Sequence, residues 1–238
     1  KKDIYSWKSS HFVMNLRTGD AIYESACGTG LNILMTLEIV QQESNGTAPI
    51  TNLTFYGNDY VPQSVEIANL LARRRNFFPS NARLGRICQG NSLNLSYVPS
   101  NVFDLVFTGY ITPLQNPLDF NYSGESKILN QYRTICTEKA RNSEAVLMQQ
   151  RQDDWFGQWV KEMVRIAKPG ASILIEQVSL PFCEILYDWG GVNQSFWTRG
   201  AREYGWNVEG IGFGTNKRSR GAVDSERYHV FMRKKNNT

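Results

Sequence analysis

The chain has 238 residues, of which 41% are hydrophobic, 12% aromatic and 20% charged, and its formal net charge is +4. This composition excludes an intrinsically disordered chain and predicts a packed core. Four cysteines lie far apart with no Cys-x-x-Cys pair, which argues against a disulfide framework and a zinc site, so we expect no bound metal. No apolar run approaches the roughly 20 residues that a membrane span needs.

Basic residues cluster at 73–75, 217–220 and 233–235 without interleaved aromatic side chains. Such clusters predict solvated surface and disfavour a nucleic-acid partner. The chain begins at Lys1 without a methionine, and its Asn-x-Ser/Thr sequons begin at Asn45, Asn52, Asn94, Asn121 and Asn193. We therefore expect a soluble protein, and we leave its compartment open between the cytoplasm and an organelle, with a removed leader as an option. The sequence does not set the oligomeric state.

Strand-like apolar runs alternate with helical patterns along the chain. The predicted strands lie at 21–23, 53–56, 83–88, 102–107, 172–175, 208–213 and 228–232. The predicted helices lie at 31–42, 62–71, 154–167 and 194–204. A Lys-Pro-Gly stop at 168–170 separates the third helix from the next strand.

This alternation predicts an α/β fold, because strands joined by helices form parallel sheets with helices on both faces. We expect a doubly wound, mostly parallel sheet of seven strands, closed by an antiparallel hairpin strand at its edge. No repeat or linker divides the chain, so we expect a single domain over 1–238. Residues 1–18 form an N-terminal segment and 112–150 an insertion, partly helical at 126–140. Both are candidate lids, with inert decoration as the alternative for the insertion.

The most informative motif is the run Glu24-Ser25-Ala26-Cys27-Gly28-Thr29-Gly30, between a predicted strand and a predicted helix. Glycines allow a tight turn and let a ligand approach the free amide groups of the helix start. A nicotinamide or flavin site requires G-x-G-x-x-G, but Ile33 occupies the third glycine position. Glu24 would repel a pyrophosphate and suits a cationic ligand, such as S-adenosylmethionine.

This run resembles the first motif of class I S-adenosylmethionine-dependent methyltransferases. Four later segments resemble further landmarks of that family, in its order: Gly57-Asn58-Asp59, Gly90-Asn91-Ser92, Phe103-Asp104-Leu105-Val106, and Arg165 to Gly170. One departure is Asn91, which stands where the family usually has an acid. The resemblance covers the chain from Arg17 to Gln177. It implies S-adenosylmethionine as the cofactor and S-adenosylhomocysteine as its product.

The resemblance also implies roles for individual residues. Asp59 is expected to hold both ribose hydroxyls, and Tyr60 to lie against the adenine. The other expected cofactor-binding residues are Glu24, Ala26, Gly28, Gly30, Asn91, Ser92 and Thr108.

Methyl transfer from a sulfonium is an in-line displacement, to which the protein contributes mainly proximity, alignment and a dry pocket. If the acceptor must lose a proton, the candidate bases are His11, Tyr110 and Glu176. The candidate acceptor-binding residues are Tyr5, Trp7, Tyr110 and Trp189, since aromatic rings can hold a cation. The alternatives are a surface or packing role for His11 and core filling for the aromatic rings.

The leading hypothesis is methyl transfer to an oxygen, nitrogen or sulfur atom of a small molecule, because the chain carries no appended recognition domain. A nucleic-acid or protein methyltransferase is the second hypothesis, suggested by the basic clusters. Against it, amino-methylating nucleic-acid enzymes typically show N-P-P-Y or D-P-P-Y where this chain has Thr108-Gly109-Tyr110-Ile111. The third is a non-catalytic protein that retains the fold for binding, which the presence of both Glu24 and Asp59 argues against.

Overall fold

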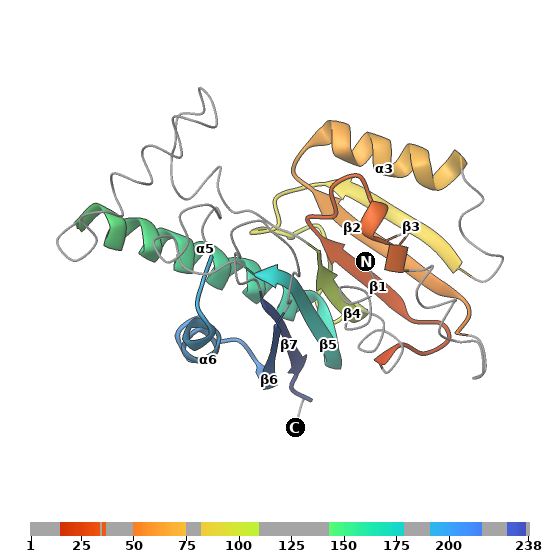
Figure 1. Ribbon diagram of the computed structural model, residues 1–238. Helices are drawn as coiled ribbons and strands as arrows, with labels where there is room; N and C mark the ends of the chain where they lie inside the picture. Colours follow the sequence, from red (N-terminus) through yellow and green to blue (C-terminus); the bar gives the residue numbers. More distant parts are fainter. Residues whose placement is uncertain are drawn as a thin grey trace.

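The computed structural model describes residues 15–33, 35–36, 50–74, 82–109, 143–178, 191–215 and 228–236. Their strands form one seven-stranded sheet in the order β3-β2-β1-β4-β5-β7-β6 (Figure 1). The strands are β1 (Ala21–Ser25), β2 (Leu53–Asp59), β3 (Ala82–Gln89), β4 (Phe103–Thr108), β5 (Ala167–Val178), β6 (Val208–Thr215) and β7 (Tyr228–Lys234). The first five pair in parallel, whereas β7 runs antiparallel to both β5 and β6.

This order confirms the predicted doubly wound α/β sheet with a closing antiparallel hairpin. The reversed strand of the hairpin is β7, which lies one place inside the edge, and β6 forms the edge itself. The strand order changes direction between β1 and β4. In open α/β sheets, ligands bind at the carboxyl ends of the strands beside such a switch point.

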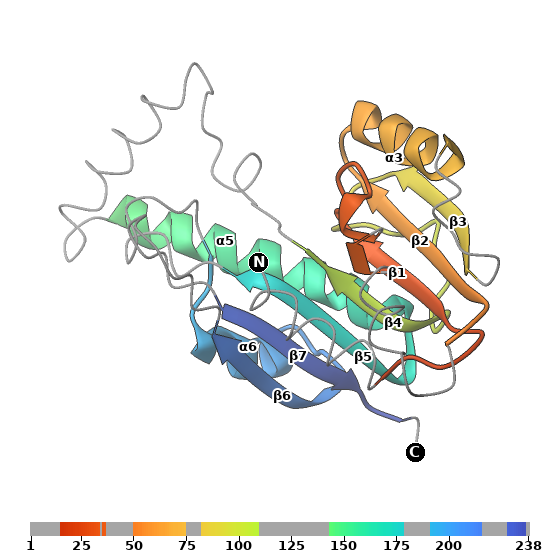
Figure 2. The same cartoon turned by 45° about the vertical axis from the view of Figure 1, so that its right-hand side comes forward.

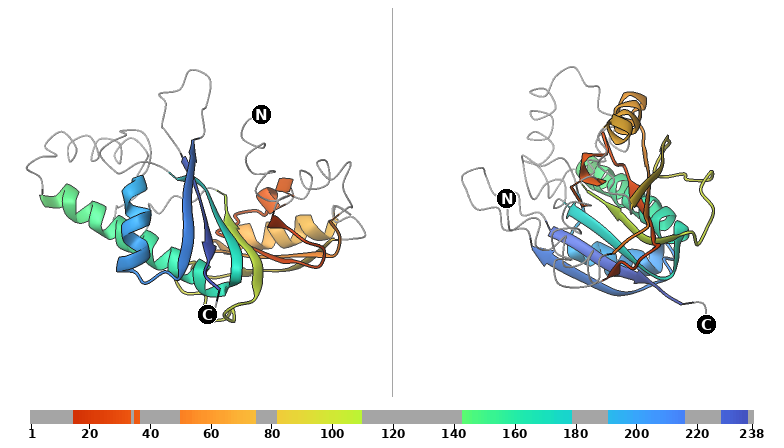
Figure 3. Two further views of the ribbon diagram at one scale, coloured as in Figure 1. Left: turned by 90° about the horizontal axis from the view of Figure 1, so that it is seen from below. Right: turned by 90° about the vertical axis from the view of Figure 1, so that its right-hand side faces the viewer.

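Helices cover both faces of the sheet, as the alternating pattern predicts. They are α3 (Pro62–Arg74), α5 (Ser143–Ile166) and α6 (Gln194–Glu203), and residues 31–33 and 35–36 are also helical. Figure 3 shows α3 beside β2 and β3 at one end of the sheet and α6 beside β6 at the other. One buried apolar cluster contains Phe156, Trp159 and Trp197, and a second, on the opposite face, contains Ile22 and Phe107.

Helix α5 begins at Ser143, well before residue 154, where the sequence pattern predicts its start. The polar run at 149–154 hides the helical periodicity. Nevertheless one stripe of the helix is buried from Gln152 through Phe156 and Trp159 to Met163. Figure 2 shows that this longer helix extends beyond the carboxyl ends of β4 and β5.

The predicted Lys-Pro-Gly stop is a bulge at the start of β5. The pairing jumps from Phe103 with Ala167 to Leu105 with Ser172, and Gly170 has a φ of 77° within the excursion. The Lys168 ammonium lies 2.7 Å from one oxygen of Asp104. The segment Lys168 to Gly170 therefore stabilises the amino ends of β4 and β5, at the opposite edge of the sheet from the carboxyl ends of the strands.

None of the helices in the described ranges combines the length and the apolar character that crossing a membrane requires.

Candidate functional site

The glycine turn after β1 is held against the end of β2. The amide of Cys27 donates a 2.9 Å hydrogen bond to the carbonyl of Asn58. A Cβ added at Gly57 would lie 2.9 Å from the Glu24 carbonyl and 3.3 Å from the Cys27 sulfur, so only glycine fits there without a shift. The two strands thus bring their motifs into direct contact.

Three residues of this turn have positive φ: Ala26 at 54°, Gly28 at 55° and Gly30 at 73°. A Cβ at Gly30 would lie 3.2 Å from the Cβ of Ala68 in α3, which explains a glycine at this close approach. A Cβ at Gly28 would meet no atom within 4 Å. Open space therefore adjoins the turn at Gly28, where a ligand could approach the backbone.

Asp59 lies beside this turn. One carboxylate oxygen accepts a 2.8 Å hydrogen bond from the Gly28 amide, and the other accepts a 2.9 Å bond from the Val61 amide. Each carboxylate oxygen has a second lone pair, so Asp59 can still accept from ligand hydroxyl groups.

Glu24 lies at the other end of the turn and is 1% exposed. Its Oε1 accepts a 2.6 Å hydrogen bond from the side-chain amide of Asn32. A Cβ at Gly109, just after β4, would lie 2.5 Å from the same Asn32 nitrogen. Sequence reasoning missed Asn32, whose available signal was a polar residue in the first turn of the helix after the glycines.

Both carboxylates, of Glu24 and Asp59, affect the thiol of Cys27. Burial raises the pKa of the Cys27 thiol, and the negative charges of Glu24 and Asp59 raise it further. The turn therefore has a negative potential, which favours a cationic ligand over a phosphate.

A buried polar network supports the loop after β3. The Asn58 side-chain amide donates to the Gly90 carbonyl at 3.0 Å and to the Ser92 hydroxyl at 2.9 Å. Tyr23 in turn donates to the Asn58 side-chain oxygen at 2.9 Å, and burial raises the pKa of this phenol, so it remains a donor. Sequence analysis missed the role of Asn58, which has no local signature.

The Gly90-Asn91-Ser92 motif suggests two residues for cofactor binding, and the network shows that they have different surroundings. Ser92 is buried and its hydroxyl accepts from Asn58, so it positions the loop. Asn91 is exposed, and its side-chain oxygen accepts a 3.0 Å bond from the Leu93 amide. Tyr60, at the end of β2, is 68% exposed. The Tyr60 ring and the Asn91 amide are therefore accessible to a ligand at this end.

Glu176 is 9% exposed, near the carboxyl end of β5. The pairing of β5 with β7 shifts between Ile175 and Val178, so Glu176 lies in an irregular stretch near the carboxyl end of the strand.

Thr108 extends from the face opposite to that of Glu24, toward α5. Val106, two residues earlier, pairs with Tyr23, and both belong to the apolar cluster on the α5 side. Ser25 shares this face, and its hydroxyl accepts a 2.9 Å hydrogen bond from the Trp159 indole, a contact that sequence analysis did not foresee.

The predicted site residues Tyr5, Trp7, His11, Tyr110 and Trp189 lie outside the described residues. Within the described ranges, no group of three or more His, Cys, Asp or Glu side chains could hold a metal ion.

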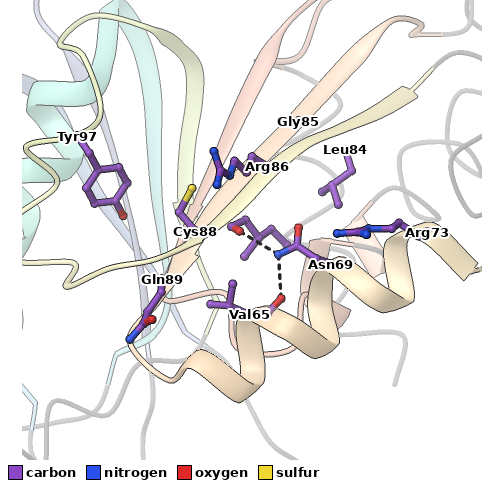
Figure 4. Close-up of a pocket in the computed structure, with 10 residues that line it drawn as sticks. Val65, Asn69, Arg73, Leu84, Gly85, Arg86, Cys88, Gln89 and Tyr97 are labelled. Carbon is purple, nitrogen blue, oxygen red and sulfur yellow. Dashed lines mark hydrogen bonds between the residues drawn. The ribbon is translucent and has the colours of Figure 1, made fainter.

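A groove of about 840 Å³ runs along β3 beside α3 (Figure 4). Its lining includes the exposed Arg73 and Arg86, and it approaches the candidate site at Gln89 and Tyr97. A Cβ at Gly90 would lie 2.2 Å from the Tyr97 hydroxyl, so the loop after β3 packs directly on this groove.

Neither a protein-family model nor a curated protein sequence matches the chain. Solved structures do match. A SAM-dependent methyltransferase from Methanosarcina mazei aligns with a TM-score of 0.57 at 12% identity, covering 94% of this chain and 96% of that one. An arsenic(III) S-adenosylmethionine methyltransferase from Chlamydomonas reinhardtii gives 0.51 at 14%, covering 92% and 64%. The [4+2]-cyclase SpnF gives 0.55 at 14%, covering 96% and 81%.

These similarities confirm that the chain has the fold of class I S-adenosylmethionine-dependent methyltransferases. At such identities the similarity concerns the fold alone. The neighbours also differ in their named activities, an arsenic methyltransferase and a cyclase among them. The reaction must therefore be argued from the site.

Proposed function

We propose that the protein binds S-adenosylmethionine and transfers its methyl group to a small-molecule acceptor. The observation that carries this proposal is the pair of carboxylates on one glycine turn, Glu24 at its start and Asp59 bonded to the amide of Gly28. The shared fold supports it, because this turn lies at the carboxyl ends of β1 and β2, beside the switch point of the sheet.

Each part of the cofactor has a chemically matched partner in this proposal. Glu24 and the backbone of the turn at Ala26, Gly28 and Gly30 bind the amino-acid end, whose ammonium is attracted by the negative potential around Cys27. Asp59 accepts hydrogen bonds from the ribose hydroxyls. Tyr60 and Asn91 contact the adenine, and Ser92 acts through the loop that it supports. The open space at Gly28 fits a ligand that approaches the backbone closely.

When bound, S-adenosylmethionine supplies an electrophilic methyl group on a positively charged sulfur. The contribution of the chain is to hold two reactants in line and to exclude water, which can lower a barrier by about 7–11 kcal/mol in favourable cases. Glu24 is almost fully buried, so its charge acts where water screens little.

A proton acceptor is needed only for acceptors that lose a proton on methylation. Among the described residues we assign this role to Glu176, which is buried near the carboxyl end of β5. His11 and Tyr110 stay candidates for it from the sequence. Alignment of the two reactants is thus needed for every acceptor, whereas a base is needed only for acceptors that lose a proton.

Two measurements test the proposal. Calorimetry with S-adenosylmethionine and S-adenosylhomocysteine should give binding that is lost in Asp59→Ala. Mass spectrometry of a metabolite extract, incubated with the protein and the cofactor, should then reveal a product heavier by one CH₂ unit. Absence of binding at millimolar ligand overturns the proposal. Binding without any methylated product supports the non-catalytic alternative, and a methylated RNA or protein in a parallel incubation supports the second hypothesis.

A further inference from the structure

Two buried polar side chains near the carboxyl ends of the strands have unpaired polar atoms. Within the described part of the chain, the Thr108 hydroxyl and both the oxygen and the nitrogen of the Gln152 amide have no hydrogen-bond partner. Both residues are 0% exposed. Buried polar groups are nearly always hydrogen-bonded, so each of these exceptions requires an explanation.

Thr108 ends β4 on the face that α5 covers. Glu24 pairs with Phe107, so Ser25 and Thr108 lie side by side and extend from the same face. Ser25 accepts the hydrogen bond of the Trp159 indole. The Thr108 hydroxyl is therefore next to the point where α5 contacts the end of the sheet.

Gln152 lies on the same stripe of α5 as Trp159. The two residues are two helical turns apart, which places Gln152 on the same helix face and about 10 Å nearer the helix start. The amide of Val102 donates to the Ile166 carbonyl, so the other end of α5 meets the amino edge of the sheet. Gln152 consequently lies toward the carboxyl edge of the sheet.

We propose that Thr108 and Gln152 bind the methyl acceptor, through neutral groups that both donate and accept hydrogen bonds, such as hydroxyls or carboxamides. This inference rests on the proposed function and deepens it. It assigns Thr108 to the acceptor instead of the cofactor, because its side chain and that of Glu24 extend from opposite faces of the sheet.

The chemistry of the two side chains selects the ligand class. Neither side chain titrates, and both are fully buried, so a charged ligand group would lose its hydration without gaining an ion pair. A carboxamide side chain offers two donors and one acceptor, and a hydroxyl offers one donor and two acceptor sites. Neutral groups of these kinds on one acceptor molecule can therefore pair with both side chains.

A first test needs no ligand. Gln152→Met and Thr108→Val keep the side-chain volume approximately and remove the polar atoms. If those atoms are unpaired in the free protein, each variant should raise the melting temperature by about 2–4 °C. Gln150→Met, at an exposed position on the same helix, is the matched control and should leave the melting temperature unchanged. A lower melting temperature in both test variants identifies structural hydrogen bonds and overturns the inference.

A second test uses defined probes. The protein is saturated with S-adenosylhomocysteine and titrated with phenol and benzamide as neutral probes, and with benzoate and benzylamine as charged ones, followed by ligand-observed NMR. We expect the neutral probes to bind better, and to bind about three- to tenfold more weakly to Gln152→Met, with S-adenosylhomocysteine affinity unchanged.

The outcomes separate the two proposals. If S-adenosylhomocysteine does not bind the wild-type protein, the proposed function and this inference fall together. If it binds, but the charged probes bind better, neither neutral probe binds, or Gln152→Met binds them as tightly as the wild type, only the inference about the acceptor falls.

Discussion

The backbone amide of Gly28 donates a hydrogen bond to the carboxylate of Asp59, 31 residues later in the chain, over 2.8 Å. This bond links the turn after β1 to the end of β2, so the two proposed anchor points for the cofactor form one unit. A ligand that binds at Asp59 therefore meets a turn whose geometry is already set.

Asp59→Asn should weaken S-adenosylhomocysteine binding by about tenfold to a hundredfold, because hydrogen bonds to a charged acceptor are stronger than those to a neutral one. Calorimetry measures the dissociation constant. Glu66→Gln, at an exposed position on α3, is the control and should bind like the wild type. Equal affinities for Asp59→Asn and the wild type would contradict the assignment.

Alanine at Gly28 should affect binding more than stability. The substitution places a Cβ in the open space beside the turn and strains a φ of 55°, at a cost of about 1–2 kcal/mol. Gly19→Ala is a matched control, because Gly19 also has positive φ and open space but lies outside the turn. Chemical denaturation should give similar stabilities for the two variants, and only Gly28→Ala should lose affinity for S-adenosylhomocysteine.

Gly30→Ala should instead lower stability more than Gly19→Ala does. Its Cβ would combine positive φ with a 3.2 Å approach to the Cβ of Ala68, so α3 must move away from the turn. We expect a loss of about 1–3 kcal/mol in the free energy of unfolding, measured with urea. A variant as stable as Gly19→Ala would show that α3 yields at no cost.

Ser25→Ala should destabilise the protein by about 1–3 kcal/mol, since it leaves the buried indole N–H of Trp159 without its acceptor. Adding Trp159→Phe to Ser25→Ala should cost less than the sum of the single changes. Urea denaturation measures this coupling, with the exposed Ser96→Ala as the control. Strictly additive losses would be inconsistent with a direct bond.

Glu162 should contribute stability that disappears in acid. Burial alone would raise the pKa of this carboxyl, but hydrogen bonds from Arg165 and from the Leu95 amide outweigh burial and lower the pKa below 4.5. A lowered folded-state pKa means that the stabilisation is complete above the unfolded-state pKa and is lost as the pH falls through the folded one. Glu162→Gln should therefore be less stable at neutral pH and lose less stability below pH 4.5. Urea titrations at neutral and acidic pH measure the stability of Glu162→Gln, with the exposed Glu66→Gln as the control. If the stability difference between Glu162→Gln and the wild type does not narrow in acid, the prediction is wrong.

Local signals in the sequence predict much of this fold. Pro62 opens α3, because its fixed φ and missing N–H suit the first turn of a helix. The alternation of apolar runs and helical patterns predicts the parallel sheet. The sequence also predicts the glycine turn and Asp59, because both belong to short motifs that are recognisable from their residue types.

Contacts between distant segments could not be predicted in the same way. Trp159 reaches Ser25 across 134 residues, and no local pattern encodes that pairing. The burial of Gln152 is equally hidden, since a polar run surrounds it and only the packing of α5 shows which stripe faces inward. Asn32 and Asn58 belong to the site through hydrogen bonds that their residue type permits but does not require.

The amide of Asn69, on α3, donates hydrogen bonds to the carbonyls of Val65 and of Ile87 on β3, the outermost strand on that side, both over 2.9 Å (Figure 4). An outermost strand normally offers its backbone to any passing extended chain and so invites aggregation. Here a side chain already occupies one of the positions that an eighth strand would need. The helix that packs against the glycine turn at Gly30 thus also covers part of this edge, which disfavours edge-to-edge association with other copies of the protein.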